Sequence, residues 1–137
     1  LKDGKVYLIE INGRAGATGL SDMVGIYYDL NYYEILCRQA MGETTASAFQ
    51  LKNSKGQPSV SRMITAPKTG ILEKIELPEE AEDPDISITL NVQPSDPVRT
   101  YQNGRDLLGL VIVKGDSVEV CKEKTNRILS GIQYEIR

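Results

Sequence analysis

The first apolar run of the chain lies at residues 5–11 and is almost uninterrupted. A run without regular polar alternation predicts a strand that is covered on both faces. Because side chains two residues apart in a strand share a face, Glu10 and Asn12 are expected to point to the same place. A glycine-rich loop follows at residues 13–19 and contains Arg14. Carboxylate and amide oxygens suit Mg²⁺, so this pattern indicates a site for a metal ion and phosphate.

Two short helices are predicted directly after this loop. Ser21 or Asp22 is expected to cap the first helix, which ends near residue 28, and Asn31 is expected to cap the second, over residues 32–41. Backbone amides at the start of the first helix would be able to receive an anion such as a substrate carboxylate.

From about residue 44 onward, short apolar runs alternate with turns that contain proline, glycine or acidic residues. Asp116, with Glu119 three residues later, has the pattern of a capping box and predicts a helix that ends at Gly131. The expected fold class is α+β, with a small antiparallel sheet or flattened barrel and one packed helix. The strands are predicted at residues 60–64, 69–76, 86–92, 107–113 and 133–136.

Composition and charge narrow the classes of protein. Apolar residues make up 40% of the chain and charged residues 26%, as in ordinary globular proteins. The net charge is −3 and the cationic residues are scattered, so neither nucleic acid nor a membrane is an expected partner. Cys37 and Cys121 are expected to be buried free thiols of a cytoplasmic protein. The chain has no histidine, which leaves no ordinary zinc site and no cysteine–histidine pair.

The stretch from Leu8 to Gly16 resembles the last conserved motif of ATP-grasp ligases, in which a hydrophobic strand carries Glu, Asn and Arg before a loop. The resemblance implies that Glu10 bridges two Mg²⁺ or Mn²⁺ ions and that Asn12 binds one of them. It also implies that Arg14 contacts the phosphate transferred from ATP, or the acyl phosphate formed from it. The alternative is a buried strand whose polar residues only cap a turn.

The second half of the chain resembles the C-terminal domain of biotin carboxylase and of bacterial L-amino acid ligases, in residues 66–72, 92–98 and 110–117. The same segments bear a fainter likeness to biotinyl carrier domains. Lys114 lacks the flanking methionines of the modified carrier lysine, so a carrier role is rejected.

These resemblances imply that the chain is the C-terminal part of a larger ATP-grasp carboxylate–amine ligase. Residues 1–43 would end its catalytic domain, and residues 44–137 would form a terminal α+β domain. The parent would activate a carboxylate with ATP, and an amine would displace phosphate from the acyl phosphate. The chain alone is expected to be inactive. Whether the parent forms a homo-oligomer is left open by the sequence. The alternatives are a biotin-carboxylase-like enzyme and a non-catalytic binding module with a residual ATP-grasp strand.

Overall fold

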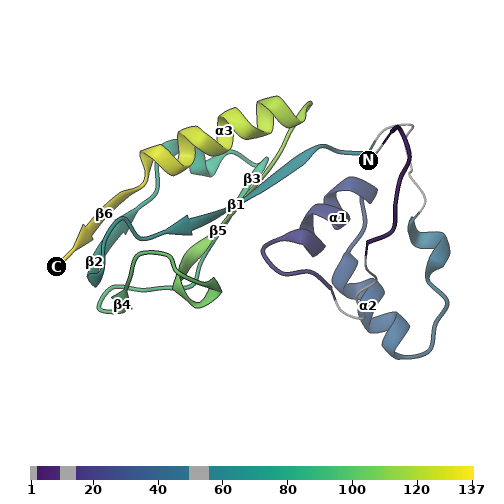
Figure 1. Cartoon of the computed structure of the whole chain (residues 1–137), viewed down its shortest axis with the longest axis horizontal. Coiled ribbons are helices and arrows are strands. Elements are labelled where there is room, and N and C mark those ends of the chain that lie inside the picture. Colours follow the sequence, from purple (N-terminus) through teal and green to yellow (C-terminus); the bar gives the residue numbers. More distant parts are fainter. Residues whose placement is uncertain (1–2, 10–14, 50–55) are drawn as a thin grey trace.

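The computed structural model describes residues 3–9, 15–49 and 56–137 (Figure 1). Within these ranges the α-helices are α1 (Leu20–Tyr28), α2 (Tyr32–Ala40) and α3 (Val118–Gly131). The strands are β1 (Ser59–Thr65), β2 (Gly70–Glu76), β3 (Ile86–Leu90), β4 (Pro97–Val98), β5 (Leu107–Lys114) and β6 (Gln133–Ile136). Short 3₁₀ helices lie at Ala46–Phe49, Glu79–Glu82 and Gly104–Asp106. The strands and α3 lie together at one end, with α1 and α2 at the other (Figure 1).

The described strands form two small antiparallel sheets, in the orders β1–β5–β3 and β4–β2–β6. The five strands predicted from the sequence are all present, with ends that differ by at most two residues. The additional strand β4 begins at Pro97, the last residue of the stretch at 94–97 that the sequence pattern assigned to a turn. The predicted α+β class, with a small antiparallel sheet and one packed helix, is confirmed.

The core has two parts. On one face of the β1–β5–β3 sheet, Val60, Val111 and Val113 pack against Cys121 and Ile128 of α3. A second cluster joins the two sheets through buried residues from both, and consists of Ile64, Ala66, Leu72, Val98, Leu108, Ile132 and Ile136. Burial of these apolar side chains is the main stabilising contribution to the fold.

The caps of the helices differ in part from the sequence prediction. Asn31 caps α2 as predicted, because its side-chain oxygen accepts a hydrogen bond from the Glu34 amide at 3.1 Å. The capping box predicted for α3 is wrong: Ser117, one residue after Asp116, is the N-cap. Its hydroxyl accepts a hydrogen bond from the Val120 amide at 3.2 Å, which leaves no capping role for a carboxylate one residue earlier.

The cap predicted for α1 is also wrong. The helix begins at Leu20 with Gly19 as N-cap, so Ser21 and Asp22 lie inside it. Burial of both cysteines was predicted, and only Cys121 is buried. Cys37 is exposed because α2 buries only Ile35 among its described residues.

The loop between β4 and β5 is organised around the carboxylate of Asp106, whose side chain is 3% exposed. The carboxylate accepts hydrogen bonds from Nε of Arg99 and from the backbone amides of Gln102 and Asn103, the last two at 2.9 Å. The hydrogen bond from the Arg99 guanidinium lowers the pKa of Asp106, and the backbone amides add to this effect.

We expect Asp106→Asn to weaken the acid dependence of stability. The pKa of Asp106 is depressed in the folded chain, so the ionised carboxylate stabilises the fold above the unfolded pKa of about 3.9. That stabilisation is lost as the pH falls through the lower folded pKa. Urea midpoints measured from about pH 2 to 6 should fall less steeply in this variant. Asp116→Asn, which removes an exposed carboxylate, should keep the wild-type dependence, and equal curves for wild type and Asp106→Asn would contradict the assignment.

Candidate functional site

The three residues with a predicted role in the site, Glu10, Asn12 and Arg14, lie outside the described residues. The structure describes the residues on either side of them, at 3–9 and 15–19. Their proposed roles therefore stay predictions. The described part of the site consists of the segments on either side of them.

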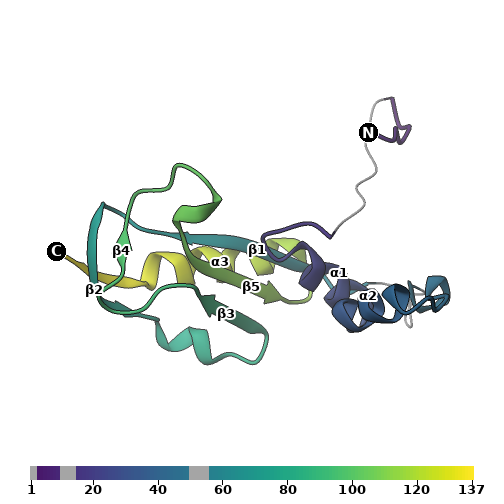
Figure 2. The ribbon, with the colours of Figure 1, turned by 90° about the horizontal axis from the view of Figure 1, so that it is seen from below.

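The flank before the motif is exposed. Val6, Leu8 and Ile9 are 86%, 76% and 95% exposed, and residues 6–9 form neither helix nor strand. The expectation of a strand covered on both faces is therefore wrong for this part of the run. An apolar run becomes a strand only where a neighbouring strand accepts its backbone hydrogen bonds, and no described strand pairs with residues 6–9. Figure 2 shows this segment standing away from both sheets.

The segment after the predicted site residues, at 15–19, contacts the β1–β5–β3 sheet on the face opposite α3. Val60 and Val111 face α3, so the alternating residues Ser61 and Leu110 point to the other side. The Ser61 hydroxyl donates a hydrogen bond to the carbonyl of Thr18 at 2.8 Å. Because of this contact, Thr18 lies against strand β1.

Gly19 lies against the same face of the sheet. A Cβ atom at this position would lie 2.8 Å from Oγ of Ser61 and 2.9 Å from Cδ2 of Leu110, which is too close for a side chain. The backbone of Gly19 is also left-handed, with φ of 80°, which favours glycine. Glycine at this position therefore allows α1 to start directly on the sheet.

The start of α1 was predicted to receive an anion through its backbone amides. The Leu20 amide donates to the carbonyl of Ala17 at 3.4 Å, and the Met23 amide donates to the carbonyl of Gly19 at 2.9 Å. Gly19 offers no side chain as a cap. Anion binding at this helix start stays a prediction.

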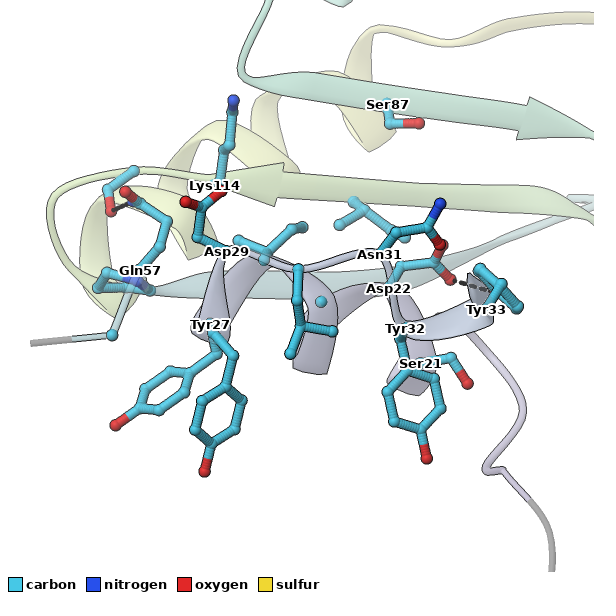
Figure 3. A pocket seen from close by; sticks show the side chains of 18 of the residues that line it. Ser21, Asp22, Tyr27, Asp29, Asn31, Tyr32, Tyr33, Gln57, Ser87 and Lys114 are labelled. Carbon is cyan, nitrogen blue, oxygen red and sulfur yellow. Dashed lines mark hydrogen bonds between the residues drawn. The ribbon is translucent and has the colours of Figure 1, made fainter. Parts of the chain in front are cut away.

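A cavity of about 950 Å³ lies beside α1, between the α1–α2 turn and the ends of β1 and β5 (Figure 3). On the helical wall, the Tyr33 hydroxyl donates to Oδ2 of Asp22 at 3.1 Å, and this hydrogen bond raises the pKa of Tyr33. On the sheet wall, Nζ of Lys114 lies 3.5 Å from Oδ1 of Asp85. Nε2 of Gln57 donates to the carbonyl of Gly115 at 2.6 Å.

Sequence reasoning missed this cavity because its walls come from segments far apart in the chain, around residues 21–33, 56–58 and 112–116. No local pattern links these segments. Among the described residues, no group of three carboxylate or thiol side chains is arranged to hold a metal ion. No described helix has the length and apolar character needed to cross a bilayer.

Comparison with known proteins identifies the family. Residues 62–137 match the model of L-amino acid ligase C-terminal domain 2, and this stretch is more than half of the chain. The chain therefore belongs to this family. The match confirms the resemblance of the second half to L-amino acid ligases, and with it the relationship to ATP-grasp ligases.

Solved structures agree with this assignment. A crystal structure of phosphoribosylglycinamide synthetase from Anaerococcus prevotii is similar with a TM-score of 0.86 and 34% identity, over 100% of this chain and 35% of that chain. A crystal structure of L-amino acid ligase from Bacillus licheniformis has a TM-score of 0.77 and 18% identity, over 99% and 34%. At that identity the second likeness shows the fold alone. This chain spans about a third of the length of these two proteins. No curated protein matches it significantly.

Proposed function

We propose that the chain is the C-terminal part of a longer ATP-grasp ligase that activates a carboxylate as an acyl phosphate for attack by an amine. The observation that carries this proposal is the order of Glu10, Asn12 and Arg14 in the same chain as a match to the L-amino acid ligase family, which begins at residue 62. The similarity to the synthetase extends over 100% of this chain.

In this proposal Glu10 and Asn12 hold Mg²⁺, because a carboxylate and an amide oxygen form a donor set that suits a hard divalent cation. The bound ion would offset the negative charge on the phosphates of ATP. Arg14 would bind the transferred phosphate, since its guanidinium can donate two parallel hydrogen bonds to phosphate oxygens. The side chains thus act by position and charge, as is usual in phosphoryl transfer.

The substrate pair follows from the relatives. The family name favours L-amino acids as both the carboxylate and the amine. The 34% identity to phosphoribosylglycinamide synthetase favours a second candidate reaction, the formation of phosphoribosylglycinamide. Both reactions join a carboxylate to an amine, so they share the proposed chemistry. Because the proposed reaction consumes ATP, we propose that the protein is cytoplasmic.

The test uses the longer protein with ATP, Mg²⁺ and pairs of L-amino acids. ADP should form only when a suitable carboxylate is present, and hydroxylamine in place of the amine should give the hydroxamate of that carboxylate, because it traps an acyl phosphate. Parallel reactions with glycine and phosphoribosylamine decide between the two candidates.

The chain of residues 1–137 alone serves as the control and should form no ADP, since it spans only about a third of its relatives. ADP formation without dependence on a carboxylate, or its absence with every pair, would contradict the proposed function.

A further inference from the structure

The cavity beside α1 has the size and the position of a ligand site. Its volume of about 950 Å³ is typical of pockets that hold small organic molecules. It lies where the α1–α2 hairpin meets the β1–β5–β3 sheet, and pockets are common at such junctions. Gln57 links the two walls, because its backbone amide donates to the carbonyl of Tyr27 at 3.4 Å and its Nε2 donates to the carbonyl of Gly115 at 2.6 Å.

The charged side chains that line the cavity are mostly acidic. Asp22 and Asp29 come from the helical wall, and Asp116 comes from the turn after β5. Lys114 is the one basic residue among the described lining residues, and its Nζ lies 3.5 Å from Oδ1 of Asp85, which offsets its charge. Figure 3 shows Asp22 and Asp29 on the hairpin and Lys114 on the neighbouring strand. The cavity therefore favours a ligand with positive charge.

The arrangement of these carboxylates favours an organic cation over a metal ion. A divalent metal ion needs several oxygen ligands around one point, and no three acidic or thiol side chains in the described ranges are arranged to hold one. A flexible chain with several ammonium groups can instead reach carboxylates on separate walls. Its methylene groups can pack on an aromatic ring such as that of Tyr27, which is 44% exposed. A carboxylate accepts several hydrogen bonds, so Asp22 can bind a cation while it accepts the bond from Tyr33.

We propose that this cavity binds a linear polyamine, whose ammonium groups contact Asp22, Asp29 and Asp116. Aliphatic amines titrate near pH 10, so the ligand carries its charges at neutral pH. The site is built from described residues at 21–33, 56–58 and 112–116. It uses none of the residues to which the proposed function assigns a role, so the two proposals are tested separately.

The first experiment locates binding in the chain itself, with spermidine as the probe. In two-dimensional NMR spectra, the amide signals of residues 21–33 and 112–116 should shift and saturate with a Kd below about 1 mM. Butylamine has one ammonium group and should bind at least about tenfold more weakly, because it reaches one carboxylate at a time. Mg²⁺ should leave these signals in place. Shifts that do not saturate, or equal shifts with Mg²⁺, would overturn the proposal.

The second experiment removes charge from the helical wall. The double variant Asp22→Asn/Asp29→Asn keeps the size of both side chains, and asparagine tolerates the left-handed backbone of Asp29, whose φ is 52°. The Kd for spermidine should rise about tenfold. Glu123→Gln/Glu135→Gln is the matched control, because it removes the same charge from exposed positions that do not line the cavity. Equal weakening in the two double variants would show general attraction to an acidic protein and would overturn the proposal.

The third experiment adds charge on the sheet wall. Ser87 is an exposed residue of β3 that lines the cavity, so Ser87→Lys should raise the Kd for spermidine by repulsion. Thr89→Lys is the control, because Thr89 lies two residues later on the same face of β3 and does not line the cavity. Circular dichroism of both variants should match the wild type. The same Kd in Ser87→Lys and Thr89→Lys would show that spermidine binds elsewhere and would overturn the proposal.

Discussion

Replacing Glu10 by glutamine in the longer ligase should lower turnover by about 10²–10³, the usual loss when a positioned electrostatic group is removed from an active site. Glutamine has nearly the same shape as glutamate but lacks the charge that would hold Mg²⁺ between the protein and ATP. Steady-state ADP formation at saturating ATP and Mg²⁺ measures the loss. Circular dichroism of the variant should match the wild type, since the change is isosteric.

Two further variants sharpen this test. Glu119→Gln removes an exposed carboxylate on α3 and should leave turnover unchanged. Arg14→Ala should also slow the chemistry, with less effect on the Mg²⁺ concentration needed for half-maximal activity, because the contact proposed for Arg14 is with phosphate and not with the metal ion. Wild-type turnover in Glu10→Gln would remove the metal-binding role assigned to this residue.

The sequence predicted the strands of the two sheets well because their signals are local. β6 begins and ends at the predicted residues, and β5 extends one residue further than expected. Alternating and continuous apolar runs bounded by proline and glycine define such strands without knowledge of their partners. The additional strand β4 has only two residues and pairs with β2 through Gly70 and Ile71, so its sequence carries no strand pattern.

Two of the errors, at the start of α1 and in the run at residues 5–11, occur where contacts distant in the sequence decide the local structure. Ser21 and Asp22 are good N-cap residues, yet α1 starts earlier because Gly19 docks on the sheet. The hydrogen bond from Ser61 to Thr18 joins residues 43 positions apart, and no local pattern indicates it. The apolar run at residues 5–11 predicts a buried strand. Apolar side chains indicate that a segment is suited to burial, but they do not show which element covers it. The described part of that run finds no such partner within the described chain and is exposed.

Replacing Leu72 by alanine should lower the free energy of unfolding of the chain by about 2–5 kcal/mol, the range for a buried leucine whose removal leaves a cavity. Leu72 is 0% exposed and lies in the cluster that joins the two sheets. Its backbone also holds the turn before β4, because its amide donates to Asp96 at 2.9 Å and its carbonyl accepts from Ser95 at 2.7 Å. Alanine keeps these backbone bonds, so the expected loss comes from apolar burial.

Ile71→Ala is the matched control, because Ile71 is the preceding residue on β2 and is 36% exposed. It should lower the free energy of unfolding much less, since part of its side chain is already in water. Urea unfolding followed by circular dichroism gives both values from the midpoint and slope. Equal losses of unfolding free energy in the two variants would contradict this expectation, because the buried Leu72 side chain would then stabilise the fold no more than the partly exposed Ile71 side chain. A large loss at Leu72 alone would support a stabilising role for the cluster between the two sheets. In that variant, Ile64 and Leu108 of the β1–β5–β3 sheet lose an apolar partner in the β4–β2–β6 sheet.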